Sequence, residues 1–206
     1  MIERQIAARG LDDPALLAAF RAVPREEFVS PDYANSAYQD GPLPIESGQT
    51  ISQPYIVALT IYAARIEPGD KVLEVGAGSG YAAAVIGQIA REVIAVERHR
   101  KLVELAQRRI ERLGYGNVRI VKGDGTLGWP EGAPYDAIVA AASGSHIPPG
   151  WIAQLNAGGR IVMPLGAPHD VQTMVKGTKT EDGLLRLEDL GGVRFVPLIG
   201  EEGFPA

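Results

Sequence analysis

Three acidic residues stand at or near the ends of short apolar runs, and their order indicates a site for a nucleoside-like ligand. Glu74 lies just before the glycine-rich run at 76–80, Glu97 ends the run at 92–97, and Asp124 lies between two glycines. Glycines permit a tight turn and let a ligand approach the backbone, and the helix start that follows offers N–H donors. A carboxylate at 97 can accept both hydroxyls of a ribose, and one at 124 can accept the exocyclic amine of adenine.

The cofactor that best matches these residues is S-adenosylmethionine. The glycine spacing is G-x-G-x-G, and Tyr81 stands where the dinucleotide fingerprint has glycine or alanine. Glu74 would repel a pyrophosphate, whereas it can accept a hydrogen bond from the cationic amino group of S-adenosylmethionine. Taken singly, Asp124 could be an Asx-turn residue and Glu97 a solvated strand end. A nicotinamide-dependent oxidoreductase stays open as a less favoured alternative.

Alternating strands and helices must position these acids. Short β-branched apolar runs predict strands at 71–75, 92–97, 118–122, 135–142 and 158–164, and helical spacing predicts helices at 79–90, 98–113 and 148–156. Apolar strands separated by helices are typical of a doubly wound, mostly parallel α/β sheet. The carboxyl edge of such a sheet is where ligands bind, and all three acids would lie there.

Both ends of the chain add to this sheet. Two short amphipathic helices are expected in the first thirty residues, followed by an ordered loop rich in proline and glycine. Runs at 172–179, 184–190 and 193–198 have no helix between them and predict antiparallel strands at one sheet edge. We expect a single domain over residues 1–206. Its parts are N-terminal helices with a substrate-side loop (1–52), a cofactor-binding core (53–170) and a C-terminal β edge (171–206).

Composition excludes several kinds of chemistry. The 206 residues include no cysteine, which excludes disulfides, thiolate metal sites and cysteine nucleophiles. His99, His146 and His169 have no metal-ligand spacing and suggest no Ser/His/Asp triad, so no metal is expected. A net charge of −5 argues against nucleic-acid binding, and no run approaches the length of an apolar membrane span. We expect a cytoplasmic, monomeric enzyme with no nucleic-acid or membrane partner.

One further segment narrows the interpretation. The order of pieces resembles the class I methyltransferases, and G-Q-T-I-S-Q-P at 48–54 is similar to the G-Q-T-I-S-x-P signature of protein-L-isoaspartate O-methyltransferases. The likeness extends to the glycine run, V-E-R at 96–98, G-D-G at 123–125, Y-D-A-I at 135–138 and V-R-F-V-P-L at 193–198. From pattern alone Ser52 would be the N-cap of a helix with Pro54 in its first turn. The resemblance instead favours an active-site serine.

The resemblance also implies the other site residues. The cofactor-binding positions would be Gln49, Thr50, Glu74, Gly76, Gly78, Ser79, Gly80, Glu97, Arg98, Asp124 and Gly125. The substrate-binding positions would be Ile51, Ser52, Tyr55, Val193, Phe195 and Val196. Two departures from the family pattern are visible: Glu46 replaces a usual glycine, and residues 141–148 replace an alanine- and proline-rich loop. Both could adjoin the substrate.

The implied activity is methyl transfer from S-adenosylmethionine to the α-carboxylate of L-isoaspartyl residues in damaged proteins or peptides, with S-adenosylhomocysteine as product. A carboxylate is already ionised near pH 7, because its reference pKa is about 4, so no general base is required and positioning should dominate the rate. The hydroxyl of Ser52 and nearby backbone N–H groups would hold the acceptor as neutral donors. The two departures leave open a methyltransferase for the carboxyl group of one modified peptide or small molecule.

Overall fold

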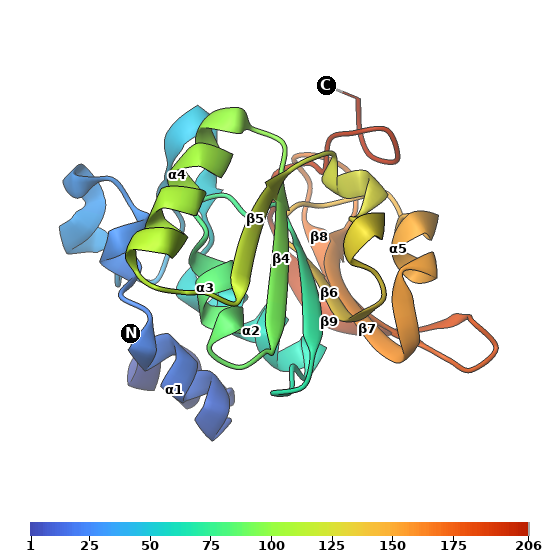
Figure 1. Cartoon of the computed structure of the whole chain (residues 1–206). Helices are drawn as coiled ribbons and strands as arrows, with labels where there is room; N and C mark the ends of the chain where they lie inside the picture. The colour runs from blue at the N-terminus through green and yellow to red at the C-terminus, as the bar shows by residue number, and fades with distance from the viewer. Residues whose placement is uncertain (206) are drawn as a thin grey trace.

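The computed structural model describes residues 1–205, and within them one mixed sheet has the strand order β5-β4-β3-β6-β7-β8-β9 (Figure 1). Neighbouring strands from β5 to β7 are parallel, whereas β8 and β9 are antiparallel to their neighbours. The strands are β3 (Lys71–Val75), β4 (Glu92–Glu97), β5 (Val118–Lys122), β6 (Tyr135–Ala140), β7 (Leu155–Leu165), β8 (Gln172–Lys179) and β9 (Leu185–Val193). The expected doubly wound, mostly parallel sheet with an antiparallel C-terminal edge is confirmed.

Helices cover both faces of the sheet. They are α1 (Pro14–Ala22), α2 (Pro54–Ala64), α3 (Tyr81–Gly87), α4 (Arg100–Arg112) and α5 (Pro149–Ala153). Helices α2, α3 and α4 lie on one side of the sheet and α5 on the other (Figure 1). Successive residues of β3 therefore enter different cores, Val72 on the α3 side and Leu73 on the α5 side, which explains the unbroken apolar pattern of this strand. No helix within residues 1–205 is long and apolar enough to cross a membrane.

The N-terminal residues pack as a cap on the face that holds α2 and α3. The first expected helix is a π-helical turn (Ile2–Ile6) continued by a 3₁₀ turn (Ala7–Arg9), and the second is α1. Asp13 caps α1 by accepting a hydrogen bond from the Leu16 N–H at 2.8 Å. Two more 3₁₀ turns (Arg25–Phe28 and Pro31–Ser36) and the short pair β1 (Leu43–Pro44) and β2 (Thr50–Ile51) lead into α2.

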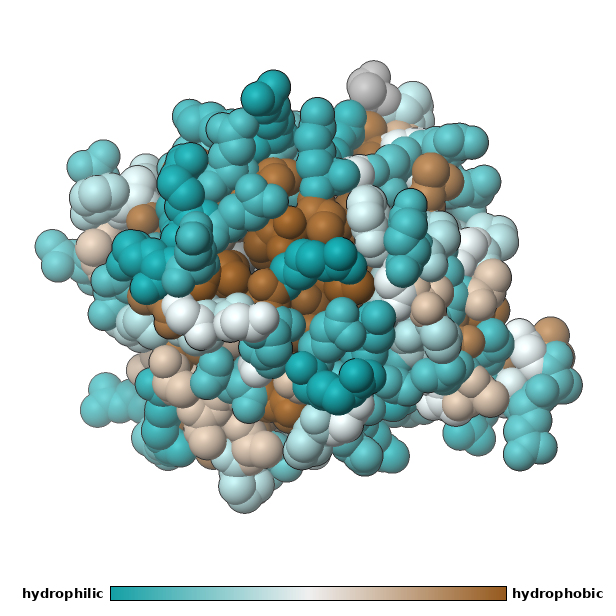
Figure 2. All heavy atoms as spheres, viewed as in Figure 1, coloured by the Kyte–Doolittle hydropathy of each residue, from teal (hydrophilic) through white to brown (hydrophobic). Residues whose placement is uncertain are grey.

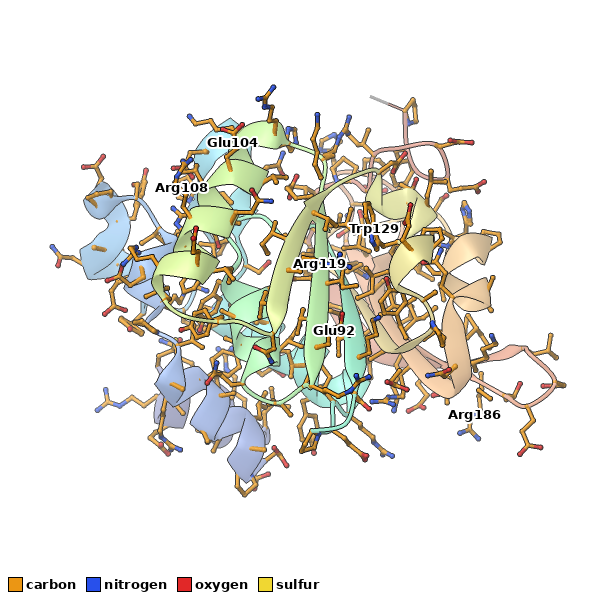
Figure 3. All side chains as sticks on the ribbon, viewed as in Figure 1. Glu92, Glu104, Arg108, Arg119, Trp129 and Arg186 are labelled. Carbon is orange, nitrogen blue, oxygen red and sulfur yellow. The ribbon has the colours of Figure 1, made fainter. Side chains whose placement is uncertain are left out.

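Charged side chains occupy the two outer strands. Figure 2 shows apolar side chains gathered over the region of β4 and β5 with polar ones lying across them, and Figure 3 places Arg119 there on β5. On the opposite edge, Arg186, Glu188 and Asp189 of β9 are exposed, and Arg186 is seen near the tip of the β8–β9 hairpin (Figure 3). Charges on an edge strand disfavour pairing with another chain.

The three core helices are shorter than the sequence predicts, with α4 (Arg100–Arg112) nearest to its predicted range of 98–113. Helix α3 begins at Tyr81 and ends at Gly87, within the expected 79–90, and α5 covers only Pro149–Ala153 of the expected 148–156. The Lys179 ammonium donates to the carbonyl oxygens of Ile152 and Leu155, both at 2.8 Å, and so satisfies backbone acceptors at the end of α5. Strand β7 consequently starts at Leu155, earlier than its predicted start at 158.

The strand predicted at 193–198 is wrong. Strand β9 ends at Val193, and the next residues leave the sheet. The Phe195 N–H donates at 2.8 Å to the side-chain oxygen of Gln172, and Pro197 has no N–H for a ladder. The Val196 carbonyl and the Leu198 N–H instead bond the backbone of Ser143, both at 2.8 Å. This segment therefore crosses from the sheet edge to the loop after β6, toward the carboxyl end of the central strands.

Candidate active site

A cleft of about 970 Å³ opens at the carboxyl ends of the central strands. We call the glycine turn, Glu97 and Gly125 the first wall of this cleft, and Ser52 with residues 192–197 its second wall. The structure thus brings together segments that are far apart in the sequence, and most of the predicted site residues line this one cleft.

The glycine turn has backbone conformations that only glycine adopts readily. Gly76, Gly78 and Gly80 have φ values of 88°, 54° and 89°, all in the left-handed region. The N–H groups of Gly76 and Ala77 both donate to the carbonyl oxygen of Val96, at 2.9 and 3.1 Å, which ties the turn to the end of β4. Gly76 and Gly78 face the cleft, and α3 begins directly after Gly80.

Glu97 spans the turn and the start of α4. Its Oε2 accepts a hydrogen bond from the Gly78 N–H at 3.0 Å, and its Oε1 accepts one from the His99 N–H at 2.8 Å. The residue is only 6% exposed but lines the cleft. A carboxylate has about four acceptor positions, so two remain for an outside donor pair such as the hydroxyls of a ribose.

Glu74 is a buried acid with an unpaired oxygen. It is 2% exposed, and its Oε2 has no hydrogen-bond partner within residues 1–205. Burial, and the nearby charge of Glu97, raise the pKa of Glu74 to about 8. Glu74 and Ser52 both line a small second cavity of about 30 Å³ next to the main cleft. A cationic group placed against Glu74 would favour its ionised form and could donate to the unpaired oxygen.

Asp124 is held by bonds that favour its ionised form. The Thr126 N–H and hydroxyl donate to its Oδ1 at 2.9 and 2.7 Å, and the Glu201 N–H donates to its Oδ2 at 2.8 Å. Partial burial raises the pKa of Asp124, but the bonds from Glu201 and Thr126 and the charge of Arg98 outweigh it and lower the pKa overall. The expected Asx turn therefore exists, and it is joined by a bond from the C-terminal segment.

Ser52 lines the cleft directly after the second strand of a short hairpin. Strands β1 and β2 pair around residues 45–49, where Ser47 and Gly48 have φ values of 59° and 68°. The Ser52 hydroxyl makes no hydrogen bond to any of residues 1–205, while the Ser52 carbonyl accepts one from Arg25 at 2.7 Å. Ser52 is not the N-cap of α2, because Gln53 holds that place and Pro54 begins the helix. The hydroxyl is free to meet a substrate.

The second wall is joined by residues of the β7–β8 loop. Val193, Phe195 and Val196 line the cleft, as do His169 and Asp170 from the β7–β8 loop. The buried Gln172 amide joins these two segments, since it accepts from the Phe195 N–H and donates to the Ala167 carbonyl at 3.2 Å. The β7–β8 loop and the segment after β9 are therefore held together at the cleft.

Comparison with known proteins decides the family. The family model described as protein-L-isoaspartate(D-aspartate) O-methyltransferase (PCMT) matches residues 1–203. The chain belongs to this family. It is 54% identical over 204 residues to protein-L-isoaspartate O-methyltransferase 1 of Rhodopseudomonas palustris (strain HaA2), with 99% of this chain and 83% of that protein covered. It is 50% identical over 204 residues to the protein-L-isoaspartate O-methyltransferase of Protochlamydia amoebophila (strain UWE25), with 99% and 97% covered.

Solved structures agree with the family. A protein-L-isoaspartate O-methyltransferase superposes with a TM-score of 0.88 at 33% identity, covering 98% of this chain and 67% of that one. A Plasmodium falciparum protein described as a protein-L-isoaspartate O-methyltransferase, in complex with S-adenosyl-L-homocysteine, superposes with a TM-score of 0.82 at 26% identity, covering 96% of each chain. The family overturns the nicotinamide-dependent oxidoreductase alternative.

Not every residue expected from the methyltransferase resemblance lines the cleft. The cleft is lined by Gln49, Thr50, Ser52, Gly76, Gly78, Glu97, Arg98, Gly125, Val193, Phe195 and Val196. Ile51 is buried in the core, and the guanidinium of Arg9 stacks on the ring of Tyr55 at 4.7 Å. Ser79 and Gly80 are buried within the turn, Glu74 lines only the small second cavity, and Asp124 is bonded to the C-terminal segment without lining the cleft.

The two departures from the protein-L-isoaspartate O-methyltransferase pattern lie mostly away from the acceptor. Glu46 is absent from the cleft wall and faces α4, where its charge acts on Arg109. In the loop at 141–148, Ala141 and Ala142 line the cleft, whereas His146 is exposed and contacts only the neighbouring Ser145 hydroxyl through its ring nitrogen. Neither departure places a new charge beside Ser52.

Sequence reasoning missed one buried residue that this methyltransferase uses to hold Ser52. Arg25 is 0% exposed, and its Nε and Nη2 donate to the carbonyl oxygens of Ala37 and Ser52, both at 2.7 Å. Its guanidinium also stacks on the Tyr81 ring at 4.7 Å, at the first residue of α3. No motif or spacing signals this role, because arginine between two helices is usually exposed. The cleft residues His169 and Asp170 were missed for a similar reason, since they lie in a loop without a motif.

Proposed function

We propose that this cleft transfers a methyl group from S-adenosylmethionine to the α-carboxylate of L-isoaspartyl residues in damaged proteins and peptides. The observation that carries the proposal is that the glycine turn and Ser52 line the same cleft. A donor on the first wall and a carboxylate on the second would meet there. The family supports both the reaction and the substrate class.

The first wall, together with the neighbouring Glu74 and Asp124, fits the cofactor. Glu97 has two acceptor positions left for the ribose hydroxyls, Asp124 is held ionised for the adenine amine, and the unpaired oxygen of Glu74 suits the cationic amino group. The left-handed glycines let the chain pass close to the ligand without side-chain collision. When bound, S-adenosylmethionine supplies a methyl group; the carboxylate oxygen bonds to the methyl carbon as the sulfur–carbon bond breaks, and S-adenosylhomocysteine leaves.

The residues of the second wall position the acceptor without removing a proton. The acceptor carboxylate is ionised near neutral pH, so its own lone pair is the nucleophile. The Ser52 hydroxyl, free of other partners, donates to the second carboxylate oxygen and orients the first. The backbone of residues 193–196 holds the peptide on either side of the abnormal linkage. A wall of backbone groups suits substrates of many sequences.

A paired methylation assay tests the proposal. The protein is incubated with methyl-labelled S-adenosylmethionine and with two peptides that differ only in an L-isoaspartyl or L-aspartyl residue. Base-labile label should enter the isoaspartyl peptide alone, because a methyl ester hydrolyses in base. Label in neither peptide, or equal label in both, contradicts the repair function. Label in neither peptide would favour the narrower acceptor, one modified peptide or a small carboxylic acid.

We also propose that the protein acts as a monomer in the cytoplasm and has no nucleic-acid partner. The absence of cysteine and the net charge of −5 support this proposal. We further propose that the single domain divides into a substrate-side N-terminal part (1–52), a cofactor-binding core (53–170) and a C-terminal edge (171–206).

A further inference from the structure

The last residues of the chain fold back onto the loop after β5. The Glu201 N–H donates to Asp124 Oδ2 at 2.8 Å, and the Glu202 N–H donates to the Thr126 hydroxyl oxygen at 3.1 Å. The turn is closed by the Gly203 N–H on the Gly200 carbonyl at 3.1 Å. Figure 1 shows this segment beyond the carboxyl ends of the central strands, on the side where the cleft opens.

The C-terminal turn packs so closely on Asp124 that a side chain at Gly200 would displace one of them. A Cβ atom at Gly200 would lie 2.1 Å from Asp124 Oδ1, far inside any real contact. At Gly203 a Cβ would lie 2.3 Å from the Leu198 carbonyl oxygen. Leu198 and Ile199, which lead into the turn, line the cleft itself. The segment is therefore built against Asp124 and continues the wall of the site.

The bonds around Asp124 leave one acceptor position open. Both positions of Oδ1 are taken by the N–H and the hydroxyl of Thr126, and one position of Oδ2 is taken by the Glu201 N–H. A carboxylate offers about four positions, so one remains on Oδ2. Because Thr126 is also fixed by Glu202, the C-terminal turn restrains both oxygens, one directly and one through the threonine.

We propose that the C-terminal turn, residues 200–204, is a positioning element of the cofactor site that aims the open acceptor position of Asp124 at the amino group of adenine. The proposal rests on the role of Asp124 given above. In an orienting role the backbone N–H of Glu201 matters and its side chain does not. The turn thereby contributes to the choice of an amino-purine over purines with another group at the same position.

The test compares two ligands on matched variants. S-adenosylhomocysteine carries the 6-amino group, whereas S-inosylhomocysteine carries an oxygen there and presents an acceptor to the carboxylate. Glu201→Pro removes the N–H, Glu201→Ala keeps it and removes only the side chain, and Gly200→Ala displaces the turn from Asp124 by collision. Asp124→Asn reports the loss of the carboxylate itself. The measurement is the ratio of the two dissociation constants for each folded variant.

The wild type and Glu201→Ala should prefer S-adenosylhomocysteine by about tenfold or more, as expected for a hydrogen bond to a charged group. Glu201→Pro and Gly200→Ala should lose most of this preference, and Asp124→Asn all of it. An unchanged ratio in Asp124→Asn would overturn both the role of Asp124 and this inference. Loss in Asp124→Asn with full preference in Glu201→Pro and Gly200→Ala would overturn this inference alone. Equal weakening of both ligands in these two variants would also overturn it, because a structural role predicts that result.

Discussion

The unpaired acid beneath the cleft predicts that cofactor binding depends on pH. Glu74 is neutral in most molecules at pH 7, because burial and the charge of Glu97 raise its pKa to about 8. In the proposed complex the cationic amino group lies against it and favours the ionised form. Binding should therefore release a proton from Glu74, and affinity for S-adenosylhomocysteine should rise with pH up to about pH 8.

The size of this pH effect on binding follows from the pKa of Glu74. Each pH unit below 8 adds about 1.4 kcal/mol to the free energy of ionising Glu74, so the dissociation constant should fall about tenfold per unit between pH 6 and 8 and then level off. Calorimetry at pH 7 in two buffers of different ionisation enthalpy should show release of about 0.9 proton per ligand. Glu74→Gln cannot ionise and should remove both effects. Glu131→Gln, an exposed change away from the cleft, should retain them.

The ligand-free protein gives a second measurement of the same group. A folded-state pKa above the unfolded value of 4.5 means that the folded chain keeps a proton that the unfolded chain releases. The unfolding free energy contributed by Glu74 should be full below pH 4.5 and fall as pH rises toward 8. Glu74→Gln should flatten this fall. Other ionisable groups also contribute to the pH slope of the unfolding free energy, so the quantity to compare is the difference in slope between the wild type and Glu74→Gln. An identical pH slope in both proteins would refute the reasoning.

Three further changes separate the roles of the two walls. Ser52→Ala should lower kcat about tenfold through loss of one neutral hydrogen bond, with nearly unchanged affinity for S-adenosylhomocysteine by calorimetry; weaker cofactor binding would contradict the assignment to the acceptor wall. Glu97→Gln should weaken that affinity about tenfold, because charge-assisted bonds become neutral, and an unchanged dissociation constant would count against a ribose contact. Arg25→Lys keeps the charge but cannot donate to both carbonyl oxygens, so kcat should fall while cofactor affinity stays; full kcat in a folded Arg25→Lys protein would show that this anchor does not position Ser52.

The cofactor wall could be predicted from sequence because it is a local structure. One strand, one glycine turn and one helix start place Glu74 and the glycines within ten residues of each other, and the left-handed φ values explain why the glycines stand there. The sheet follows from the same signals, since its central strands are apolar on both faces. Predicting the position of Glu97 required only the next parallel strand.

The acceptor wall depended on contacts between distant residues. The run at 193–198 has the composition of a strand, but bonds from Gln172 and Ser143 draw it out of the sheet, and neither partner can be found by periodicity. The start of β7 was misplaced because a lysine from β8 ends α5. The bond from Glu201 to Asp124 joins residues 77 apart, so the role of the C-terminal turn is visible only in the folded chain.

The placement of Arg25 suits a reaction whose nucleophile is a carboxylate. A guanidinium facing the acceptor would bind it firmly but withdraw electron density from the oxygen that must attack the methyl carbon. Here the cation donates to the carbonyl oxygen of Ser52 and lies over the Tyr81 ring, so it fixes the serine backbone from behind. In the proposed complex the acceptor would then meet the Ser52 hydroxyl and nearby backbone N–H groups. Arg194 also lines the cleft, and its guanidinium likewise donates to a backbone carbonyl, that of His169, at 3.2 Å. In the proposed complex these two cations would hold the backbone of the cleft while neutral donors hold the acceptor, which would keep it both positioned and reactive.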